Sequence, residues 1–568
     1  MELNFNHLKK LSKQNDKSLP AILIALLGDT ATQLLATAIK GMGQVRNFKA
    51  ELFEADFNQV EMQFLDKNSE LYKFNADFAI VFQSTHKLLG KKTENLAENR
   101  LHFVKEILSK FSGKIIYFNY AEIDDSVFGN FANKLETSFI YQIRKLNFEL
   151  MNLAAQNPDL HILDIASIQN KYGRKFMFSP SIYASTEMVL SIDCLPIAAS
   201  RIFDIICASR GIFKKCVVLD LDNTLWGGIV GDDGLENLKL GHGLGIGEIF
   251  VEFQEWLKKL KERGIILAVC SKNDESTAKE VFEKHPEMVL KLDDISVFVA
   301  NWENKADNIR KIQNILNIGF DSIVFLDDNP AEREIVRQNL PAVCIPELPK
   351  DPAEWLEFLY GENLFETASF SREDKERTKQ YREQAERASF EQSFANESDF
   401  LKSMEMECEI EDFTKFNTPR VAQLSQRSNQ FNLRTVRYSE ADIQNLANNG
   451  NYKNFAFSLK DKFGDSGLIA VVVLEKQGKN LFIESWFMSC RVLKRGMENF
   501  TLNAIAEYAK ENGFEKIAGE YLPTVKNKLV ENHYRDLDFA SLGNGKFELN
   551  VCDYAERECF IKTKGDTE

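Results

Sequence analysis

The chain has 568 residues, of which 44% are hydrophobic and 27% are charged. This composition is ordinary for a folded soluble protein, and the length corresponds to about three or four domains. Its 85 acidic side chains outnumber the 70 basic ones, for a formal net charge of −15. Because nucleic-acid binding needs a basic surface, the composition argues against a DNA- or RNA-binding protein, and we expect no nucleic-acid partner.

The sequence predicts neither a membrane span nor a disulfide framework. No apolar run reaches the about 18 residues that a spanning helix needs, and the first residues are polar rather than secretory in pattern. Nine cysteines are scattered from Cys194 to Cys559 without a CxxC pair, which is typical of reduced thiols. We therefore expect a cytoplasmic protein.

Residues 1–205 have the pattern of an α/β domain. The continuous apolar run at 21–27 ends at Gly28, Asp29 and Thr30, as a buried parallel strand does before a turn into a helix. A long helical stretch covers about 130–155. Further strands are predicted at 78–82, 114–120 and 160–165. Strands that alternate with helices favour a parallel sheet.

Residues 213–350 show the same alternation more strongly. Each of four apolar runs ends in polar residues and precedes a helical segment; they are KKCVVLDLD (214–222), GIILAVCS (264–271), SVFVAN (296–301) and SIVFLDD (322–328). The pattern predicts a second parallel sheet with helices on both faces.

The remaining chain is expected to contain a connector and a third domain. Residues 351–400 include a charged stretch nearly free of aliphatic side chains, which predicts a solvated helical connector. Residues 401–568 contain apolar runs at 455–463, 467–476, 480–489 and 515–522, with a helix predicted at about 495–511. This order indicates an α+β domain with an antiparallel meander.

The chemistry is concentrated at the strand ends of the second sheet. Asp220 and Asp222 leave the first strand with Thr224 close behind, and Asp327 and Asp328 leave the last. Like charges so close together are costly unless a cation lies between them, and ligands bind at the carboxyl ends of parallel strands. Acidic oxygens at this edge predict a Mg²⁺ site.

Polar groups that follow the two middle strands complete a phosphoryl-transfer site. Ser271 and Asn273 end one strand, and Lys305 lies near the start of a later helix. A hydroxyl and an ammonium group can bind phosphate oxygens while Asp220 attacks phosphorus. Asp222 can protonate the leaving oxygen and then activate water. Taken alone, each of these residues also fits a strand cap or a solvated turn.

The ordered set DLDNT, strand-ending Ser, Lys and DD resembles the haloacid dehalogenase superfamily of phosphotransferases. This resemblance implies a Rossmann-like fold with Asp220 as nucleophile and Asp222 as general acid and base. It implies that Ser271 and Lys305 hold phosphate, with Thr224 and Asn273 supporting the loop. It further implies that Asp220, the carbonyl of Asp222, and Asp327 ligate Mg²⁺, with Asp328 as a water-bridged or outer ligand.

The spacing leaves no room for an inserted cap domain. About two dozen residues separate Thr224 from the helix near Glu248, and 34 positions separate Ser271 from Lys305. A folded domain usually needs about 50 residues or more. We therefore expect a capless, open site with a glycine-rich flap, suited to a bulky or protein-borne substrate.

The longer string VVLDLDNTLWGGIVGDDG, with CSKN and FLDDNPAERE, resembles the FkbH-like subfamily. The resemblance implies a glyceryl transferase and phosphatase that takes a phosphoglyceroyl unit from 1,3-bisphosphoglycerate. It would remove phosphate and load glyceryl on an acyl carrier protein as a thioester. Cys270, beside Ser271, is a candidate acyl-accepting thiol, although strand cysteines are more often buried.

The first domain resembles an SGNH hydrolase at Gly28-Asp29-Thr30, where serine normally follows Gly-Asp. Thr30 replaces that serine, and no DxxH motif occurs near the end of the domain. A nucleophile without its base is weak, so we expect an inactive hydrolase fold used for docking or as a lid. His86 is expected to be a loop histidine.

The last domain resembles a GNAT acyltransferase, in which a glycine-rich turn binds the pyrophosphate of coenzyme A. The corresponding segment here is RVLKRGMEN, with Lys494 where the first glycine is expected. Arg491, Lys494, Arg495 and Gly496 are therefore candidates for acyl or pantetheine binding; a surface role for these charges is as consistent with the sequence.

Three functions remain open from the sequence. The first is an Mg²⁺-dependent phosphotransferase that passes an acyl group to a carrier thiol. The second is a simple phosphatase of a sugar or carrier-linked phosphate in polysaccharide or secondary-metabolite synthesis. The third is a scaffold that docks a carrier protein. The expected ligands are a small phosphorylated substrate and the phosphopantetheine arm of an acyl carrier protein.

Overall fold

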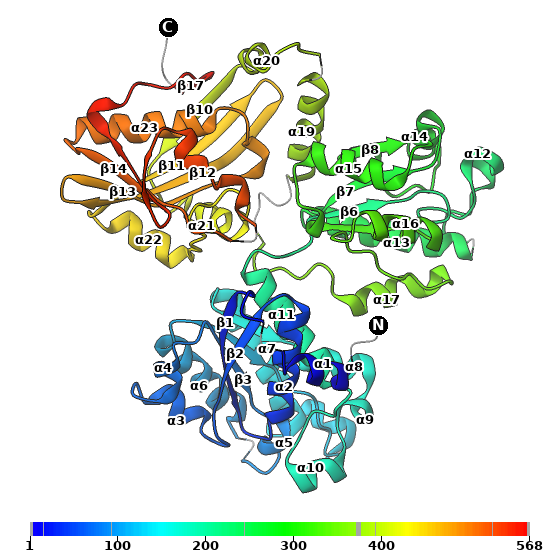
Figure 1. The fold of residues 1–568 in the computed structure, drawn as a ribbon. Helices are drawn as coiled ribbons and strands as arrows, with labels where there is room; N and C mark the ends of the chain where they lie inside the picture. The colour runs from blue at the N-terminus through cyan, green and yellow to red at the C-terminus, as the bar shows by residue number, and fades with distance from the viewer. Residues whose placement is uncertain are drawn as a thin grey trace. The chain divides into compact units, whose positions relative to one another are not determined.

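A computed structural model describes residues 4–14, 16–92, 94–243, 245–370, 377–391, 393–524 and 526–564. The chain divides into two compact units, residues 1–207 and 208–568, and each is described by itself. Figure 1 shows the ribbon, coloured along the chain. None of the described helices combines the length and the apolar character needed to cross a membrane.

The first unit is built on a five-stranded parallel sheet with strand order β2-β1-β3-β4-β5. The strands are β1 (Ala21–Gly28), β2 (Lys49–Glu54), β3 (Phe78–Phe82), β4 (Lys114–Phe118) and β5 (Leu160–Leu163). The helices are α1 (Phe5–Leu11), α2 (Gln33–Val45), α3 (Val60–Leu65), α4 (Glu70–Phe74), α5 (Thr85–Leu88), α6 (Leu96–Lys110), α7 (Phe139–Gln156), α8 (Ile165–Tyr172), α9 (Arg174–Met177), α10 (Pro180–Thr186) and α11 (Leu195–Ser209).

Strand burial explains this fold. The side chains of β3 are all buried, so this central strand is covered on both faces, as its apolar sequence predicts. One face packs on α3, α6 and α7 through a single apolar cluster. The half-buried β2 lies at the edge of the sheet, and its weakly alternating sequence gave no prediction of a strand.

The second unit begins with a four-stranded parallel sheet in the order β8-β7-β6-β9. Its strands are β6 (Cys216–Leu219), β7 (Ile266–Ser271), β8 (Val297–Ala300) and β9 (Ile323–Leu326). The helices around it are α12 (Val230–Asp233), α13 (Ile246–Glu262), α14 (Glu275–Lys284), α15 (Lys305–Leu316), α16 (Pro330–Asn339) and α17 (Trp355–Glu362). One apolar cluster joins the sheet to α13 and α14, and another joins it to α15 and α16.

An eight-stranded mixed sheet, the C-terminal sheet, follows in the order β15-β16-β14-β13-β12-β11-β10-β17. Its strands are β10 (Met406–Glu411), β11 (Tyr452–Asp461), β12 (Gly464–Gln477), β13 (Asn480–Met488), β14 (Lys516–Glu520), β15 (Ala540–Gly543), β16 (Lys546–Asn550) and β17 (Ile561–Thr563). The other helices are α19 (Arg377–Glu391), α20 (Glu397–Ser403), α21 (Thr418–Arg427), α22 (Glu440–Asn448), α23 (Met497–Glu511) and α24 (His533–Asp536). The predicted meander is present as β11-β12-β13.

The structure confirms the predicted fold class, a multidomain α/β protein with two parallel sheets and an α+β part. It divides the chain at Cys207 and Ala208, near the first predicted boundary, and keeps both later sheets in one compact unit. One expectation needs correction: helix α19 of the connector is solvated on only part of its surface, with Lys379 and Glu386 exposed. Tyr381 packs in the core of the four-stranded sheet, and Arg387 forms a buried ion pair with Asp461 of β11. Residues 371–376 and 392 of the predicted connector lie outside the described residues.

Candidate active site

The first acidic residue of the site follows a fully buried strand. Strand β6 pairs with β7 and β9, so its carboxyl end lies at the centre of the four-stranded sheet. Asp220 extends this strand, and its backbone N–H donates to the carbonyl of Leu326 on β9 (3.0 Å). Asn223 then adopts a left-handed conformation with φ of 55°, which turns the chain away from the sheet. Asp220 is thereby fixed at the carboxyl edge, where ligands of parallel sheets bind.

Lys305 lies between two of the predicted acidic residues. It begins α15 after the cap Asn304, and its ammonium group lies 2.9 Å from Asp220 Oδ2 and 2.6 Å from Asp327 Oδ2. Only 2% of Lys305 is exposed. Burial alone would lower the pKa of Lys305, but the two carboxylates outweigh it and raise that pKa. The lysine is therefore held as a cation at the floor of the site.

Three carboxylates form a group that could hold a metal ion. Asp220, Asp327 and Asp328 each offer an oxygen, and these oxygens all lie within 4.8 Å of one another. Burial and repulsion from Asp220 raise the pKa of both Asp327 and Asp328. Asp220 Oδ1 is buried without a hydrogen-bond partner in the described structure. A buried carboxylate oxygen without a partner is costly, so the set fits a hard divalent cation.

The Asp222 side chain makes its hydrogen bonds outside this group of three carboxylates. Its Oδ1 accepts hydrogen bonds from Trp226 Nε1 (2.9 Å) and the Val230 N–H (3.1 Å), and its Oδ2 accepts from Asn273 Nδ2 (2.8 Å). The Asn273 amide also lies 3.4 Å from the hydroxyl of Ser271. Asp222, Ser271 and Asn273 thus form one polar group beside the acidic cluster. The carboxylate of Asp222 is outside that cluster, and its role as general acid and base stays a prediction.

Thr224 and Arg333 hold the loop that follows β9. The Thr224 hydroxyl accepts from the Asp328 N–H (3.2 Å), which agrees with the expected supporting role of Thr224. Arg333, from α16, donates to the backbone carbonyls of Asp327 (2.7 Å) and Asp328 (2.8 Å). The sequence analysis missed Arg333. Its position six residues after Asp327, early in the helix that begins at Pro330, is the one signal that could have indicated it.

The flap between Asp222 and α13 contains little regular structure. Its described residues include the short helix α12 and two isolated bridges, Asp222 with Trp226 and Gly227 with Lys239. Gly228 has a φ of 106°, and an added Cβ there would meet a carboxylate oxygen of Asp233 at 2.7 Å. The described residues of the flap therefore form short turns and no folded cap.

Comparisons with known proteins agree with this site. A family model described as the FkbH N-terminal domain matches residues 23–207. The N-terminal part of BF1531 from Bacteroides fragilis, which contains a phosphatase domain complexed with Mg, is 59% identical; the match covers 65% of this chain and all of that one, with a TM-score of 0.64. The chain belongs to the FkbH family. No curated protein matches it in sequence.

The C-terminal part of this FkbH-family chain matches acetyltransferases at low identity. The ribosomal-protein-S18-alanine N-acetyltransferase from Escherichia coli is 14% identical over 27% of this chain and 98% of that one, with a TM-score of 0.21. The spermidine N-acetyltransferase from Vibrio cholerae is also 14% identical, over 26% and 97%, with a TM-score of 0.22.

Cys270 of the FkbH-family chain is unsuited to the role of an acyl acceptor. The side chain is fully buried with Cys216 and Val218 in the core beneath α15, and its Sγ lies 3.7 Å from the Lys305 carbonyl. Burial, offset only in part by Lys305, raises the pKa of the thiol to about 12. Because the thiolate is the nucleophile, the expectation that Cys270 carries an acyl group is wrong.

The candidate residues of the C-terminal domain lie in different surroundings. Arg495 is buried and paired with Asp461 (3.1 Å), so it does not face a ligand site. Lys494 is exposed with φ of 65°, and its backbone N–H donates to the Glu498 carboxylate; Gly496 has φ of 79° and begins α23. The chain's own acid thus occupies the helix start where an anionic ligand was expected. Arg491 differs, because it lines a cavity.

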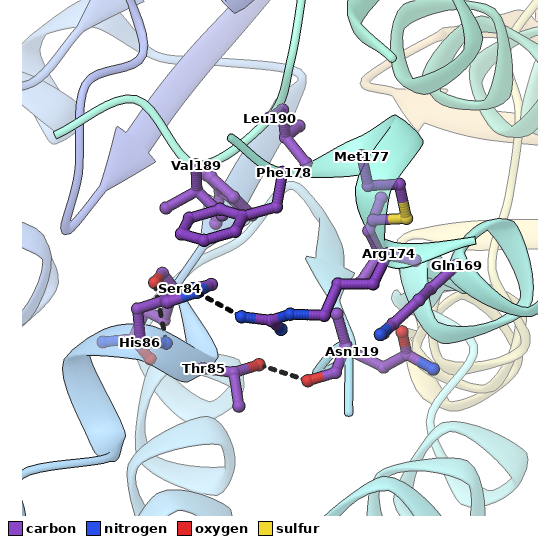
Figure 2. Close-up of a pocket in the computed structure, with 14 residues that line it drawn as sticks. Ser84, Thr85, His86, Asn119, Gln169, Arg174, Met177, Phe178, Val189 and Leu190 are labelled. Atoms are coloured by element: carbon purple, nitrogen blue, oxygen red, sulfur yellow. Dashed lines mark hydrogen bonds between the residues drawn. The ribbon is translucent and has the colours of Figure 1, made fainter. Parts of the chain in front are cut away.

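The first unit holds a small pocket of about 30 Å³ at the ends of β3 and β4, shown in Figure 2. His86 Nε2 lies 3.1 Å from an Arg174 nitrogen, and its ring stacks on Phe178 with centroids 4.1 Å apart. Burial and Arg174 lower the pKa of His86 to about 4. Thr30 is fully buried, and its hydroxyl has no partner among the described residues. That the first unit is an inactive hydrolase fold stays a prediction.

Proposed function

We propose that the chain is an Mg²⁺-dependent phosphatase of the haloacid dehalogenase type that acts on a phosphorylated acyl unit. The observation that carries this proposal is the group of Asp220, Asp327 and Asp328 around the buried Lys305. The 59% identical relative, whose phosphatase domain is complexed with Mg, supports both the reaction and the metal.

In the first step, an Asp220 oxygen attacks phosphorus, and the bond from phosphorus to the leaving oxygen breaks. Asp222 donates a proton to that oxygen when it leaves as an alkoxide, and the product is an aspartyl-phosphate. Asp222 then takes a proton from water, the water oxygen attacks phosphorus, and phosphate departs with Asp220 restored. The Asp222 contacts to Trp226 Nε1 and the Val230 N–H orient this carboxyl group.

Lys305 compensates negative charge during both steps. Its ammonium group already contacts Asp220 and Asp327, so it lies where charge develops on the transferring group. Asp220, Asp327 and Asp328, with the carbonyl of Asp222, would hold Mg²⁺. When bound, the ion supplies Lewis-acid stabilisation of the phosphoryl oxygens.

We further propose that the substrate is a phosphoglyceroyl unit from 1,3-bisphosphoglycerate, delivered to an acyl carrier protein. The buried state of Cys270 favours direct transfer, in which the carrier thiolate attacks the acyl carbon and the acyl phosphate leaves as inorganic phosphate. The two steps at Asp220 then remove the remaining 3-phosphate, its alkoxide oxygen being the leaving group, and leave a glyceryl thioester on the carrier. The short flap, whose described residues form no folded cap, suits a substrate carried on a protein.

The decisive experiment measures how fast the full chain, with Mg²⁺, releases inorganic phosphate from the phosphorylated acyl substrate. Asp220→Asn removes the nucleophile and should lower the rate by at least about a thousandfold while leaving the circular dichroism spectrum unchanged. Asp307→Asn, an exposed acid on α15, is the matched control and should retain full activity. Undiminished release by Asp220→Asn would end the phosphatase assignment.

A second measurement separates transfer from simple hydrolysis. Intact-mass analysis of a carrier protein, after incubation with the enzyme and 1,3-bisphosphoglycerate, should show a gain of one glyceryl group. Phosphate release without that gain would favour the simple phosphatase.

A further inference from the structure

Trp302 is exposed at the edge of the four-stranded sheet that carries the acidic cluster. It lies in segment 301–304, which connects β8 to α15 (Figure 1), and 76% of the residue is exposed. Tryptophan is a largely buried residue in folded proteins. The other tryptophans of this chain are buried or partly buried; they are Trp226, Trp256, Trp355 and Trp486. Trp302 is therefore the one tryptophan that the fold leaves open to solvent.

Hydrogen bonds fix the backbone on both sides of Trp302. The Asn301 N–H donates to the Ser271 carbonyl (3.1 Å), and the Asn301 side chain accepts from the Glu303 N–H (2.9 Å). Asn304 caps the following helix through its side chain. The indole itself has no hydrogen bond or ring contact within the part of the chain that the structure describes. A fixed backbone that presents an unused aromatic side chain is preorganised to contact a ligand.

Segment 301–304 also joins two parts of the proposed active site. At its start it is bonded to Ser271, at the end of β7. At its end Lys305 begins α15, and the Lys305 ammonium group lies 2.9 Å from Asp220 Oδ2. Three residues of chain span at most about 11 Å, which limits the distance between the Cα atoms of Trp302 and Lys305. The exposed indole therefore belongs to the mouth of the phosphate site.

The flap supplies a second exposed apolar side chain close to this site. Ile229 is 44% exposed, and its N–H donates to Asp233 Oδ2 (2.8 Å). The next residue, Val230, donates its N–H to Asp222 Oδ1 (3.1 Å). In the proposed reaction Asp222 protonates the leaving oxygen, so the organic group bonded to that oxygen lies beside Asp222. Apolar side chains from two separate segments thus lie near the place where this group leaves the site.

The exposed indole is suited to the part of the substrate beyond the phosphate. The described residues of the flap form no folded cap, so an organic group attached to the phosphate extends toward solvent. A small phosphorylated metabolite ends near the acidic cluster and has nothing to place on an indole. The phosphopantetheine arm of a carrier protein continues past the short carbon chain of the glyceryl unit with methylene and amide groups. An indole matches both, because it offers an apolar face and one N–H donor.

We infer that Trp302 is a specificity-determining residue, which contacts the phosphopantetheine arm of a carrier-bound substrate. The inference rests on the proposed function, because the arm is placed by a phosphate held at the acidic cluster. It adds the group by which the protein distinguishes a carrier-bound phosphate from a free one.

The first test compares two synthetic substrates that differ only in the arm, the pantetheine thioester and the methyl thioester of 3-phosphoglycerate. With the full-length chain and Mg²⁺, Trp302→Ala should lower kcat/KM for the pantetheine thioester about tenfold or more, chiefly through KM. The value for the methyl thioester should change by less than about twofold, because that substrate makes no contact with the indole. Trp302→Phe, which keeps an aromatic face, should retain most of the preference for the arm.

A matched control removes an exposed aromatic side chain elsewhere in the same unit. Phe416, which precedes α21, is 96% exposed, and Phe416→Ala should leave both substrates unaffected. An equal loss on both substrates in Trp302→Ala would show that the indole supports the phosphate site rather than the arm. That result, or an unchanged preference for the pantetheine thioester, would overturn the inference.

A binding measurement separates failure of this inference from failure of the proposed reaction. In Asp220→Asn, tryptophan fluorescence is recorded during titration with each thioester, and the double variant with Trp302→Phe identifies the signal of Trp302. The pantetheine thioester should change that signal and the methyl thioester should not. This response in a chain that releases no phosphate would refute the reaction and keep the contact. An equal response to both thioesters, or a response that persists without Trp302, would refute the contact.

Discussion

The sheet of the first unit and the four-stranded sheet of the second unit both place an aspartate after a buried strand, yet only the second brings several charged side chains together at that end. Asp220 meets Lys305, Asp327 and Asp328 from other elements of its sheet. Asp29 instead accepts a hydrogen bond from the Ser84 N–H (2.9 Å), and the neighbouring Thr30 is buried. A strand end supplies the position for chemistry, but convergent titratable groups supply the chemistry itself.

Among the substitutions that test this comparison, Lys305→Met is expected to have the largest effect on phosphate release and on the free energy of unfolding. The change leaves Asp220 and Asp327 buried without their cation, so phosphate release should fall by about 10²–10³-fold and the free energy of unfolding by about 3–5 kcal/mol. Urea unfolding and a phosphate-release assay measure both. Lys87→Met, which breaks the more exposed Lys87–Glu187 pair of the first unit, should cost less than about 1 kcal/mol. Equal losses in the two variants would contradict the central role of Lys305.

Asp29→Asn should stabilise the first unit at neutral pH. Burial raises the pKa of Asp29 to about 6 from 3.8. The folded state therefore binds more protons than the unfolded state between these values, so the Asp29 contribution is full below pH 3.8 and is lost as the pH rises through 6. A difference of two pKa units corresponds to about 3 kcal/mol in the free energy of unfolding. Asp29→Asn should therefore raise that free energy by this amount at pH 7.5 and leave it unchanged at pH 4. Hydrogen exchange of β1 at both pH values measures the gain, and a gain independent of pH would disprove this origin.

Mg²⁺ should stabilise only the second unit. At a hundred times its dissociation constant, an ion bound to the folded state alone adds about 2.7 kcal/mol. Hydrogen exchange should slow in β6 and β9 while β1 is unaffected. Asp327→Asn should remove the response, and a response that persists in this variant would place the ion elsewhere.

The smallest effect is expected from Thr30→Val. The Thr30 hydroxyl is buried without a described partner, so its removal should be neutral or stabilising by up to about 1 kcal/mol. Thermal unfolding and phosphate release test this together. A loss of phosphate release would assign the first unit a catalytic role that its buried threonine does not suggest.

Strands with continuous apolar runs could be predicted from the sequence. The run at 78–82 coincides with β3, and the acidic strand ends indicated which residues would surround Lys305. The short strands β10, β15, β16 and β17 escaped prediction because their pairing depends on distant partners rather than on local pattern. The burial of Cys270 also depended on tertiary packing, since Val218 and α15 cover it from separate parts of the sequence.

Helix α19 belongs to two cores at once. Tyr381 lies among apolar side chains of the four-stranded sheet, and six residues later Arg387 is bound to Asp461 of the C-terminal sheet. A continuous helix transmits a shift at one end to the other, because its backbone hydrogen bonds resist bending. Unfolding of either sheet would remove the contacts that hold one part of this helix. The two sheets are therefore expected to unfold in a single cooperative step.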